Sequence, residues 1–320
     1  MRTTRLLISW AVVLGWLLGG MAVAPAQSNK LPVVASILPL ADFCRQIGGE
    51  RVEVLALIPP GASPHTFEPS PTMLTGLSRA RLVVINGAGL EPWLERFLKD
   101  KQAGKPVVVT ATAGLELIKE VPQHVQEDEM AGEHRAKSGR HDHHSHGHDH
   151  GEVNPHVWLD PVLAQQICRA IAAALISADP EGRPVYEQQL QDYLNRLAAL
   201  NEKIAAATKE FRIKEFVGFH PSFSYFARRY GLREVGIIEV APGREPTPRA
   251  LQRILAAVQR YGIKVIFAEP QFSPRIAEVL AKQAGVSVLT LDPIGGRPPY
   301  GDNYLRLMEF NLDTMTQAMK

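Results

Sequence analysis

Cysteine is scarce in this sequence, and an excess of charge of one sign is absent. Cys44 and Cys168 are the only cysteines in 320 residues, and their separation is unlike the spacing of a zinc finger. The chain has 35 Lys and Arg against 33 Asp and Glu, and the surplus is confined to Arg2 and Arg5. Because the rest of the chain is electrically balanced, we expect no nucleic-acid partner.

Recognisable catalytic motifs are also missing. The sequence has no H-E-x-x-H motif and no clear Ser/His/Asp set. We therefore expect a protein that is not an enzyme. A zinc-dependent hydrolase or lyase stays the alternative from another class, with Glu269 as the residue that would serve as its base.

Residues 1–26 have the three parts of a secretory signal peptide. Arg2 and Arg5 form a positive start, residues 6–18 form an apolar core, and Ala24-Pro25-Ala26 resembles a cleavage signal. The apolar core is short for a membrane span, so we expect cleavage near Ala26 and export to the periplasm rather than an uncleaved anchor. In that oxidising compartment the two cysteines are compatible with a disulfide or with two separate buried thiols.

The remaining chain contains eight short runs rich in Val, Ile and Leu, in two sets of four. Such continuous apolar runs are typical of parallel strands buried on both faces, and helical stretches lie between most of them. The sequence thus predicts an α/β fold with two similar lobes, each a mostly parallel four-stranded sheet flanked by helices. The expected strands are 31–37, 52–58, 81–86 and 105–111, then 215–220, 234–240, 264–269 and 286–292.

A long helical pattern separates the two sets of strands. Apolar residues recur at helical spacing through 183–211, and no Gly or Pro interrupts the pattern after Pro184. We expect this helix to join the lobes as a stiff strut, although one more core helix would show the same pattern. The expected domains are an N-terminal lobe at 27–180, a linking helix at 181–211 and a C-terminal lobe at 212–320. A polar, histidine-rich insertion occupies about 119–153.

Only three histidines lie outside the insertion, and each stands at the end of a predicted element. His65 is in the proline-rich loop after strand 52–58, His156 precedes a helix, and His220 ends strand 215–220. Asp292 ends the last strand. Ligands of open α/β sheets gather at the carboxyl ends of strands. Taken alone, each of these residues also suits a turn or a satisfied core position. Together, three imidazoles and a carboxylate match the ligand set of Zn²⁺.

The sequence resembles the metal-binding receptors of bacterial ABC importers (the cluster A-I, TroA-like family), and within them the periplasmic zinc-uptake branch. The segments that carry the resemblance span nearly the whole chain after residue 26 and include "PGASPHTFEPSP", "NPHVWLDP", "HPSFSYFARRYGL", "FAEPQFSPRIAEVLA" and "LDPIG". The resemblance implies two α/β lobes joined by one long helix. It also implies that Zn²⁺ is the transported ligand and that the metal ligands are His65, His156, His220 and Asp292.

Two features of the resemblance favour zinc. The third ligand position is typically glutamate in the manganese branch and is His220 here. The zinc branch also carries a histidine- and acid-rich insertion before its second ligand motif, as residues 124–150 do here. The fourth ligand varies in that branch between a carboxylate, a neighbouring glutamate and water. Pro64 excludes a glutamate before His65, so Asp292 is expected as a direct ligand, with a water-mediated or supporting role as its alternative.

The insertion predicts a second and weaker metal-binding device. Its histidines lie among acidic residues, so several different sets of three side chains could bind one metal ion. Binding would order a flexible segment, and the lost chain entropy lowers the affinity of the insertion for the metal. We expect it to collect zinc beside the main site, whereas a dispensable linker is the alternative. The accessory ligands expected here are His141, His143, His144, His146, His148 and His150.

The function that these observations favour is that of a transport receptor. We expect a monomer that captures Zn²⁺ between its lobes and delivers it to an inner-membrane ABC permease with a cytoplasmic ATPase. A manganese or iron receptor of the same family is the alternative within this class, and three nitrogen ligands disfavour it.

Overall fold

The computed structural model describes residues 30–100, 106–119, 153–239 and 246–320. Residues Leu31–Lys320 form one compact unit. The expected signal peptide and the six accessory histidines of the insertion lie outside the described residues. The expected domain boundaries stay predictions.

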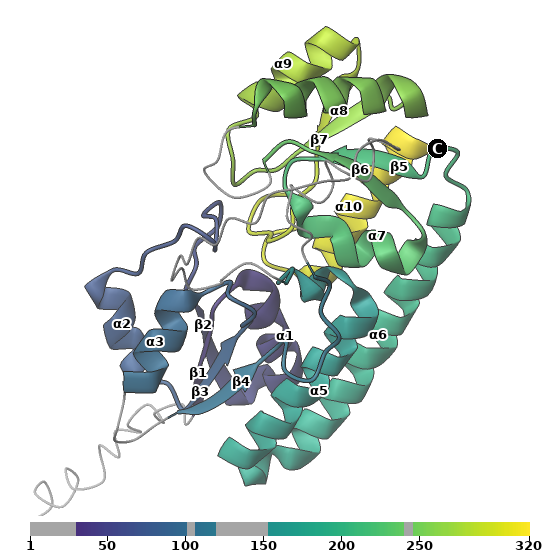
Figure 1. The fold of residues 1–320 in the computed structure, drawn as a ribbon. Coiled ribbons are helices and arrows are strands. Elements are labelled where there is room, and N and C mark those ends of the chain that lie inside the picture. The colour runs from purple at the N-terminus through teal and green to yellow at the C-terminus, as the bar shows by residue number, and fades with distance from the viewer. Residues whose placement is uncertain (1–29, 101–105, 120–152, 240–245) are drawn as a thin grey trace, which may run out of the picture. The chain divides into compact units, whose positions relative to one another are not determined.

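All eight expected strands are present, and they form two parallel sheets of four (Figure 1). The first sheet has the order β2-β1-β3-β4 and the second has the order β6-β5-β7-β8, so the two share one topology. In each sheet the chain adds its first strands toward one edge and its later strands toward the other, so the strand order reverses between the two central strands. Ligands of open α/β sheets bind at this point of reversal. The strand bounds are β1 Leu31–Ala35, β2 Val52–Ala56, β3 Leu82–Ile85, β4 Val107–Thr110, β5 Glu215–Gly218, β6 Arg233–Ile237, β7 Val265–Ala268 and β8 Ser287–Thr290.

Helices cover both faces of the first sheet, which explains why its central strands are apolar throughout. Val34, Val83 and Ile85 point to α2 (Pro71–Ser78) and α3 (Pro92–Asp100). Their neighbours Val33 and Val84 point to the opposite face, which α1 (Leu38–Gly48) and α5 (Pro161–Ala178) cover. Alternate residues of one strand therefore enter two different cores, as the pleat of a strand requires.

The second sheet repeats this arrangement. Val217 and Ile266 pack beneath α8 (Pro248–Tyr261) and α9 (Arg275–Ala284). Phe216 and Phe267 belong to the opposite face and share a core with α7 (Ser224–Tyr230) and α10 (Tyr304–Met319). Gly285, at φ +70°, ends α9 as the sequence indicates. The sequence predicts Ser273 as the N-cap of this helix and Pro274 as its first residue, but Pro274 itself stands at the cap and the helix begins one residue later, at Arg275.

The long helical pattern forms α6, an uninterrupted helix of 27 residues over Arg183–Lys209. It contacts α1 and α5 from the first half of the chain and α7 and α10 from the second. One apolar core runs from the first sheet along α6 to the inner face of the second sheet. The expected fold class, two parallel α/β lobes with one long helix between them, is thereby confirmed.

The two cysteines are free and fully buried, Cys44 in α1 and Cys168 in α5, so the alternative of two separate thiols holds. Burial raises the pKa of Cys44 to about 12. Helix α5 is the one described helix long and apolar enough to cross a membrane, but half of it is buried inside the protein, as in a core helix.

Candidate metal centre

The three histidines outside the insertion reach one point from three separate segments. His65 lies in the proline-rich loop that follows β2, and His220 stands two residues after β5. His156 directly precedes a short 3-10 turn, Val157–Leu159, and Asp160 then caps α5 by accepting from the backbone N–H groups of Val162 and Leu163. Pro161 at the first helical position favours that start, which places His156 shortly before the helix.

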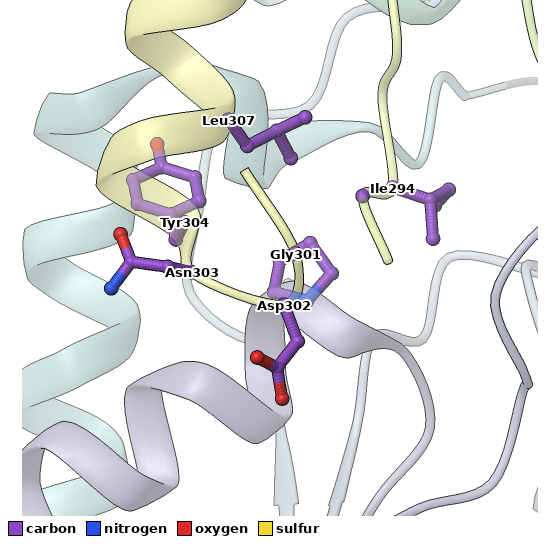
Figure 2. Close-up of a pocket in the computed structure, with 8 residues that line it drawn as sticks. Ile294, Gly301, Asp302, Asn303, Tyr304 and Leu307 are labelled. Carbon is purple, nitrogen blue, oxygen red and sulfur yellow. The ribbon is translucent and has the colours of Figure 1, made fainter. Parts of the chain in front are cut away.

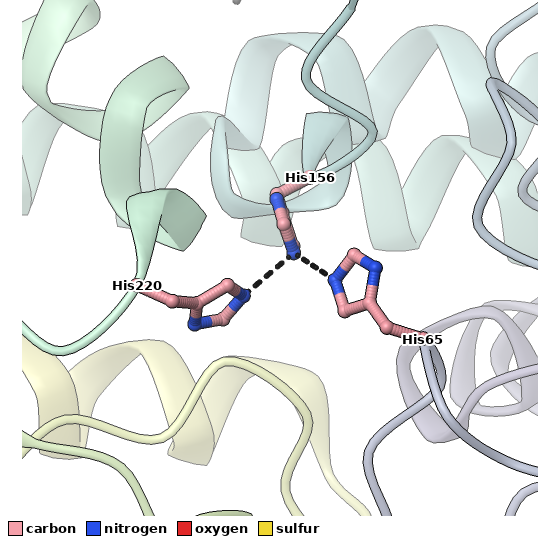
Figure 3. A group of neighbouring side chains, drawn as sticks. All are labelled: His65, His156 and His220. Atoms are coloured by element: carbon pink, nitrogen blue, oxygen red, sulfur yellow. Dashed lines mark hydrogen bonds between the residues drawn. The ribbon is translucent and has the colours of Figure 1, made fainter. Parts of the chain in front are cut away.

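Their ring nitrogens face one another (Figure 3). The Nε2 atom of His156 lies 3.1 Å from Nε2 of His65 and 3.1 Å from Nε2 of His220. One ring nitrogen of each histidine lies within 4.8 Å of a ring nitrogen of the other two. Among the described residues, this is the one group of three or more His, Cys, Asp or Glu side chains that could hold a metal ion. His156 and His220 are only 2% and 4% exposed, so the site is largely closed to solvent.

Hydrogen bonds at the other ring nitrogen fix the tautomer of two of these imidazoles. His156 Nδ1 lies 2.9 Å from Asn154 Oδ1, which can only accept, so Nδ1 carries the proton. Asn154 is held in turn because its Nδ2 donates to the carbonyl of Pro221 at 2.6 Å. His220 Nδ1 lies 2.8 Å from Oε1 of Glu269 and donates to that carboxylate. His156 therefore presents an unprotonated Nε2 to the shared point, and His220 is held with its Nε2 facing the same point.

That arrangement calls for a cation between the rings. Two ring nitrogens at 3.1 Å attract each other only when a proton or a metal cation lies between them, and one cation can serve all three rings at once. Four ligands at about 2.0–2.1 Å from Zn²⁺ in a tetrahedron stand about 3.3 Å apart, close to the observed separations. The donor set and its spacing therefore fit a tetrahedral zinc ion with three protein nitrogens.

The electrostatics keep two of these rings neutral and ready to bind a metal. Burial and the neighbouring His220 lower the pKa of His65 to about 3. Burial, followed by the neighbouring His220 and His65, lowers the pKa of His156 well below its usual value of 6.5. No proton has to leave either ring when a metal binds near neutral pH.

Asp292 is not part of this group, which differs from the expectation. Its Oδ1 accepts from the backbone N–H groups of Ile294 and Gly295 and from Gln271 Nε2, at 2.9 to 3.0 Å. Its Oδ2 accepts from the hydroxyl of Tyr300 at 2.6 Å. Both oxygens are thus engaged in holding the turn that follows β8. In this conformation Asp292 holds Gln271 and Ile294, which line the site, and a direct bond from Asp292 to the metal stays a prediction.

Apolar side chains close the surroundings of the three histidines. Phe272 packs its ring 5.3 Å from that of His220, and Trp158 lies at the same distance from His156. The small hollow at the site is also lined by Ile294, Pro64 and Gln271. A second hollow lies at the start of α10, around Asn303 and Leu307 (Figure 2). It contains none of the three histidines and offers no comparable set of ligands.

Contacts between the two halves of the chain hold the site together. Trp158 Nε1 donates to the carbonyl of Pro293 at 2.7 Å, and the Tyr225 hydroxyl donates to the carbonyl of Asn154 at 2.7 Å. Arg229 of α7 pairs with the buried cap Asp160 at 2.8 Å. Each contact joins the segment that carries His156 to the second half of the chain.

Sequence reasoning did not identify Asn154 as a contributor, and it considered Glu269 only as a catalytic base. The signal for Asn154 is weak, since Asn before Pro is an ordinary turn residue. The signal for Glu269 is the pairing of its strand with the strand that carries His220, which appears only once the sheet order is known.

Two α/β lobes, each with a parallel sheet, and three converging imidazoles, two of them buried, define a binding protein for a transition-metal cation. A family model described as ZnuA, the periplasmic component A of a zinc-uptake complex, matches residues 33–318. The chain belongs to this family.

Relatives support the assignment over nearly the whole chain. The high-affinity zinc uptake system protein ZnuA of Bacillus subtilis (strain 168) is 30% identical over 300 residues, which cover 92% of this chain and 90% of the relative. The zinc-binding lipoprotein AdcA of Streptococcus pneumoniae serotype 4 is 30% identical over 294 residues, or 91% of this chain. This chain spans 56% of that longer relative.

Solved structures agree with the fold. A crystal structure of ZnuA superimposes with a TM-score of 0.74 at 28% identity and covers 90% of this chain and 99% of that one. The Zn(II)-bound structure of a variant of AdcAII from Streptococcus pneumoniae gives a TM-score of 0.75 at 27% identity and covers 91% and 99%. A zinc-bound ZnuA lacking an internal segment gives 0.75 at 27% identity and covers 91% and 98%.

Proposed function

We propose that this chain is the zinc receptor of an ABC importer, and that it binds Zn²⁺ through His65, His156 and His220. The observation that carries the proposal is the meeting of three Nε2 atoms, with two rings locked in the tautomer that directs a lone pair to the same point. Membership of a zinc-uptake family supports zinc as the transported ion.

Binding replaces the water shell of the ion by three imidazoles that are already oriented. Asn154 and Glu269 hold two of the rings before the ion arrives, so little side-chain freedom is lost on binding. A fourth ligand completes the tetrahedron, either Asp292 after a change in its hydrogen bonds or a water molecule. Because α6 contacts helices of both halves of the chain, we propose that release involves a small shift of the lobes rather than a wide opening.

The partners of the receptor follow from this function. We propose that it is exported with cleavage near Ala26, acts in the periplasm as a monomer, and passes zinc to an inner-membrane permease driven by a cytoplasmic ATPase. We further propose that it has no catalytic activity. Hydrolysis of an activated ester that tracks zinc occupancy would contradict this last point.

The histidine-rich insertion is proposed to collect zinc for the receptor. Deleting residues 124–150 should leave one tightly bound zinc per chain, since the three histidines of the proposed site remain. Under zinc limitation the deletion should slow growth of cells that depend on this receptor. Unchanged uptake and unchanged metal selectivity in the deleted protein would refute the collector role.

Metal analysis of the purified chain lacking residues 1–26 tests the central proposal. The protein should contain one zinc that resists dialysis, and His156→Ala should lose it, because His156 Nε2 lies beside both other ligands. His124→Ala is the matched control, since it removes a histidine of the insertion. Retention of the tight site by His156→Ala would refute the proposed ligand set.

A competition titration tests the choice of metal. Wild-type protein should prefer Zn²⁺ over Mn²⁺ strongly, and His220→Glu should narrow that preference because a carboxylate oxygen suits Mn²⁺ better than imidazole does. Equal preference in both proteins would argue that His220 does not select the metal.

A further inference from the structure

We propose that Glu269 is a positioning residue for metal binding: it fixes the His220 imidazole with its Nε2 lone pair toward the ion and places a negative charge one imidazole away. Glu269 belongs to none of the expected ligand sets, and it contacts His220 through the ring nitrogen that faces away from the other two histidines. This inference rests on the zinc-receptor function proposed above.

The sheet itself places Glu269 opposite His220. Strands β5 and β7 run parallel and pair Val217 with Ile266, a separation of 49 positions that also relates His220 to Glu269. His220 and Glu269 therefore leave adjacent strands at the same height, at the carboxyl edge of the sheet. Because a parallel register is set by the whole strand pair, the spacing of these two side chains does not depend on a mobile loop.

Several donors hold the carboxylate in place. Oε1 accepts from His220 Nδ1 at 2.8 Å, from the hydroxyl of Ser222 at 2.9 Å and from the backbone N–H of His220 at 3.4 Å. Oε2 lies 2.7 Å from the same Nδ1. Glu269 is 4% exposed and Ser222 is fully buried, so water does not compete for these bonds. A buried carboxylate with this many donors keeps one rotamer.

The charge of Glu269 gives it a role that Asn154 cannot have. Three neutral imidazoles leave both positive charges of Zn²⁺ uncompensated beside the apolar rings of Phe272 and Trp158. A carboxylate behind a metal-bound imidazole offsets part of that charge and makes the ring a stronger ligand. His156 has the neutral Asn154 in the equivalent position, so Glu269 supplies the charged member of the pair.

These contacts differ from those of a catalytic base. A base needs a carboxylate oxygen that reaches a metal-bound water molecule. Oε1 is occupied by His220 and Ser222, and Oε2 is buried against the same ring nitrogen, with no hydrogen-bond partner and no solvent contact. Glu269 acts through His220 instead.

The experiment compares zinc affinity and the tautomer of His220 in the full chain without residues 1–26. The variants are Glu269→Ala and Glu269→Gln, and Glu278→Gln is the matched control because it makes the same chemical change at an exposed position of α9. Zinc affinity is measured by competition with a chromophoric chelator, and ¹⁵N NMR of the zinc-free protein reports which imidazole nitrogen carries the proton.

Glu269→Ala should weaken zinc binding about 10- to 100-fold, the usual effect of removing such a partner. It should also turn the His220 signal from a pure Nδ1–H tautomer into a mixture. Glu269→Gln keeps an acceptor for Nδ1–H but loses the charge, so it should keep the tautomer and show a smaller loss. Glu278→Gln should behave as wild type.

Affinities of both Glu269 variants within twofold of wild type would overturn the inference, as would an unchanged His220 tautomer in Glu269→Ala. If Glu269→Ala does not fold, the zinc affinity of the isosteric Glu269→Gln variant relative to wild type decides whether the inference holds. A wild-type protein without tight zinc binding would instead refute the proposed function, so the two failures are distinguishable.

Discussion

Zinc affinity at the three-histidine site should change little as the pH falls from 7.5 to 5.5. The protein for this measurement lacks residues 124–150, so that the histidines of the insertion do not contribute. Burial and the neighbouring His220 lower the pKa of His65 to about 3, and burial lowers that of His156 well below 6.5. Protons therefore do not compete with zinc for these two rings in this range.

The size of the effect follows from the number of rings that titrate. A free histidine, with a pKa of about 6.5, goes from about 90% to about 10% deprotonated between pH 7.5 and 5.5 and loses about tenfold in metal affinity. Three such ligands would lose about 1,000-fold together. Because His65 and His156 are already neutral, these two ligands lose no affinity to protons, so the total loss should stay well under about 100-fold.

Competition with a chelator at pH 7.5, 6.5 and 5.5, corrected for protonation of the chelator, gives the affinities. Calorimetry in buffers of different ionisation enthalpy counts the protons released when zinc binds. At pH 6.0 we expect fewer than one proton from the ligands, against about two for three free histidines. A 100-fold fall in affinity across the range would refute the reasoning from burial.

The same two histidines should make the zinc-free protein less stable in acid. Their pKa values are lower in the folded chain than in the unfolded chain, so the unfolded chain binds more protons below pH 6.5. The contribution of these two rings to the free energy of unfolding is complete above pH 6.5 and is lost as the pH drops toward 3. His65 alone should cost about 1.4 kcal/mol at pH 5.5, measured by urea denaturation, and His156 should add to this loss. A flat stability profile from pH 7.5 to 5.5 would contradict the lowered pKa values.

Two substitutions test the turn after β8. Asp292→Asn should destabilise the zinc-free protein by about 1–3 kcal/mol, since an amide nitrogen cannot accept from the Tyr300 hydroxyl. An unchanged free energy of unfolding would show that Asp292 does not hold the turn. The zinc affinity of the same variant decides whether Asp292 is also a ligand. Gly296→Ala should cost more than Gly285→Ala. Both glycines have positive φ, but a Cβ at 296 would lie 2.6 Å from Cβ of Pro60, whereas one at 285 meets nothing within 4 Å. Equal losses in the free energy of unfolding would show that the close approach is unimportant.

The elements of the fold were predictable because their signals are local. A buried parallel strand such as Leu82–Ile85 is apolar at every position, since helices cover both of its faces. Helix α6 was predictable because an apolar stripe persists through it without a glycine. The start of α9 was misplaced by one residue, since Ser273 and Pro274 are both acceptable at a helix start.

The candidate site was only partly predictable. The shortage of histidine outside the insertion directed attention to His65, His156 and His220, and the structure brings these three together. Asp292 also stands at the end of a strand, as expected, but the backbone N–H groups of the turn that follows take up its carboxylate. Sequence cannot weigh those N–H groups against a metal, because the competition depends on distances of a few tenths of an ångström.

The sequence by itself determined which segments become strands and helices and which few side chains were able to bind a metal. Both depend on residue type and on spacing within a short window. Only the tertiary structure decided that three Nε2 atoms meet and that Asn154 and Glu269 set their tautomers. Those relations join residues as far apart as His65 and His156, 91 positions along the chain. They are fixed by packing of the two sheets and α6, and no local pattern records that packing.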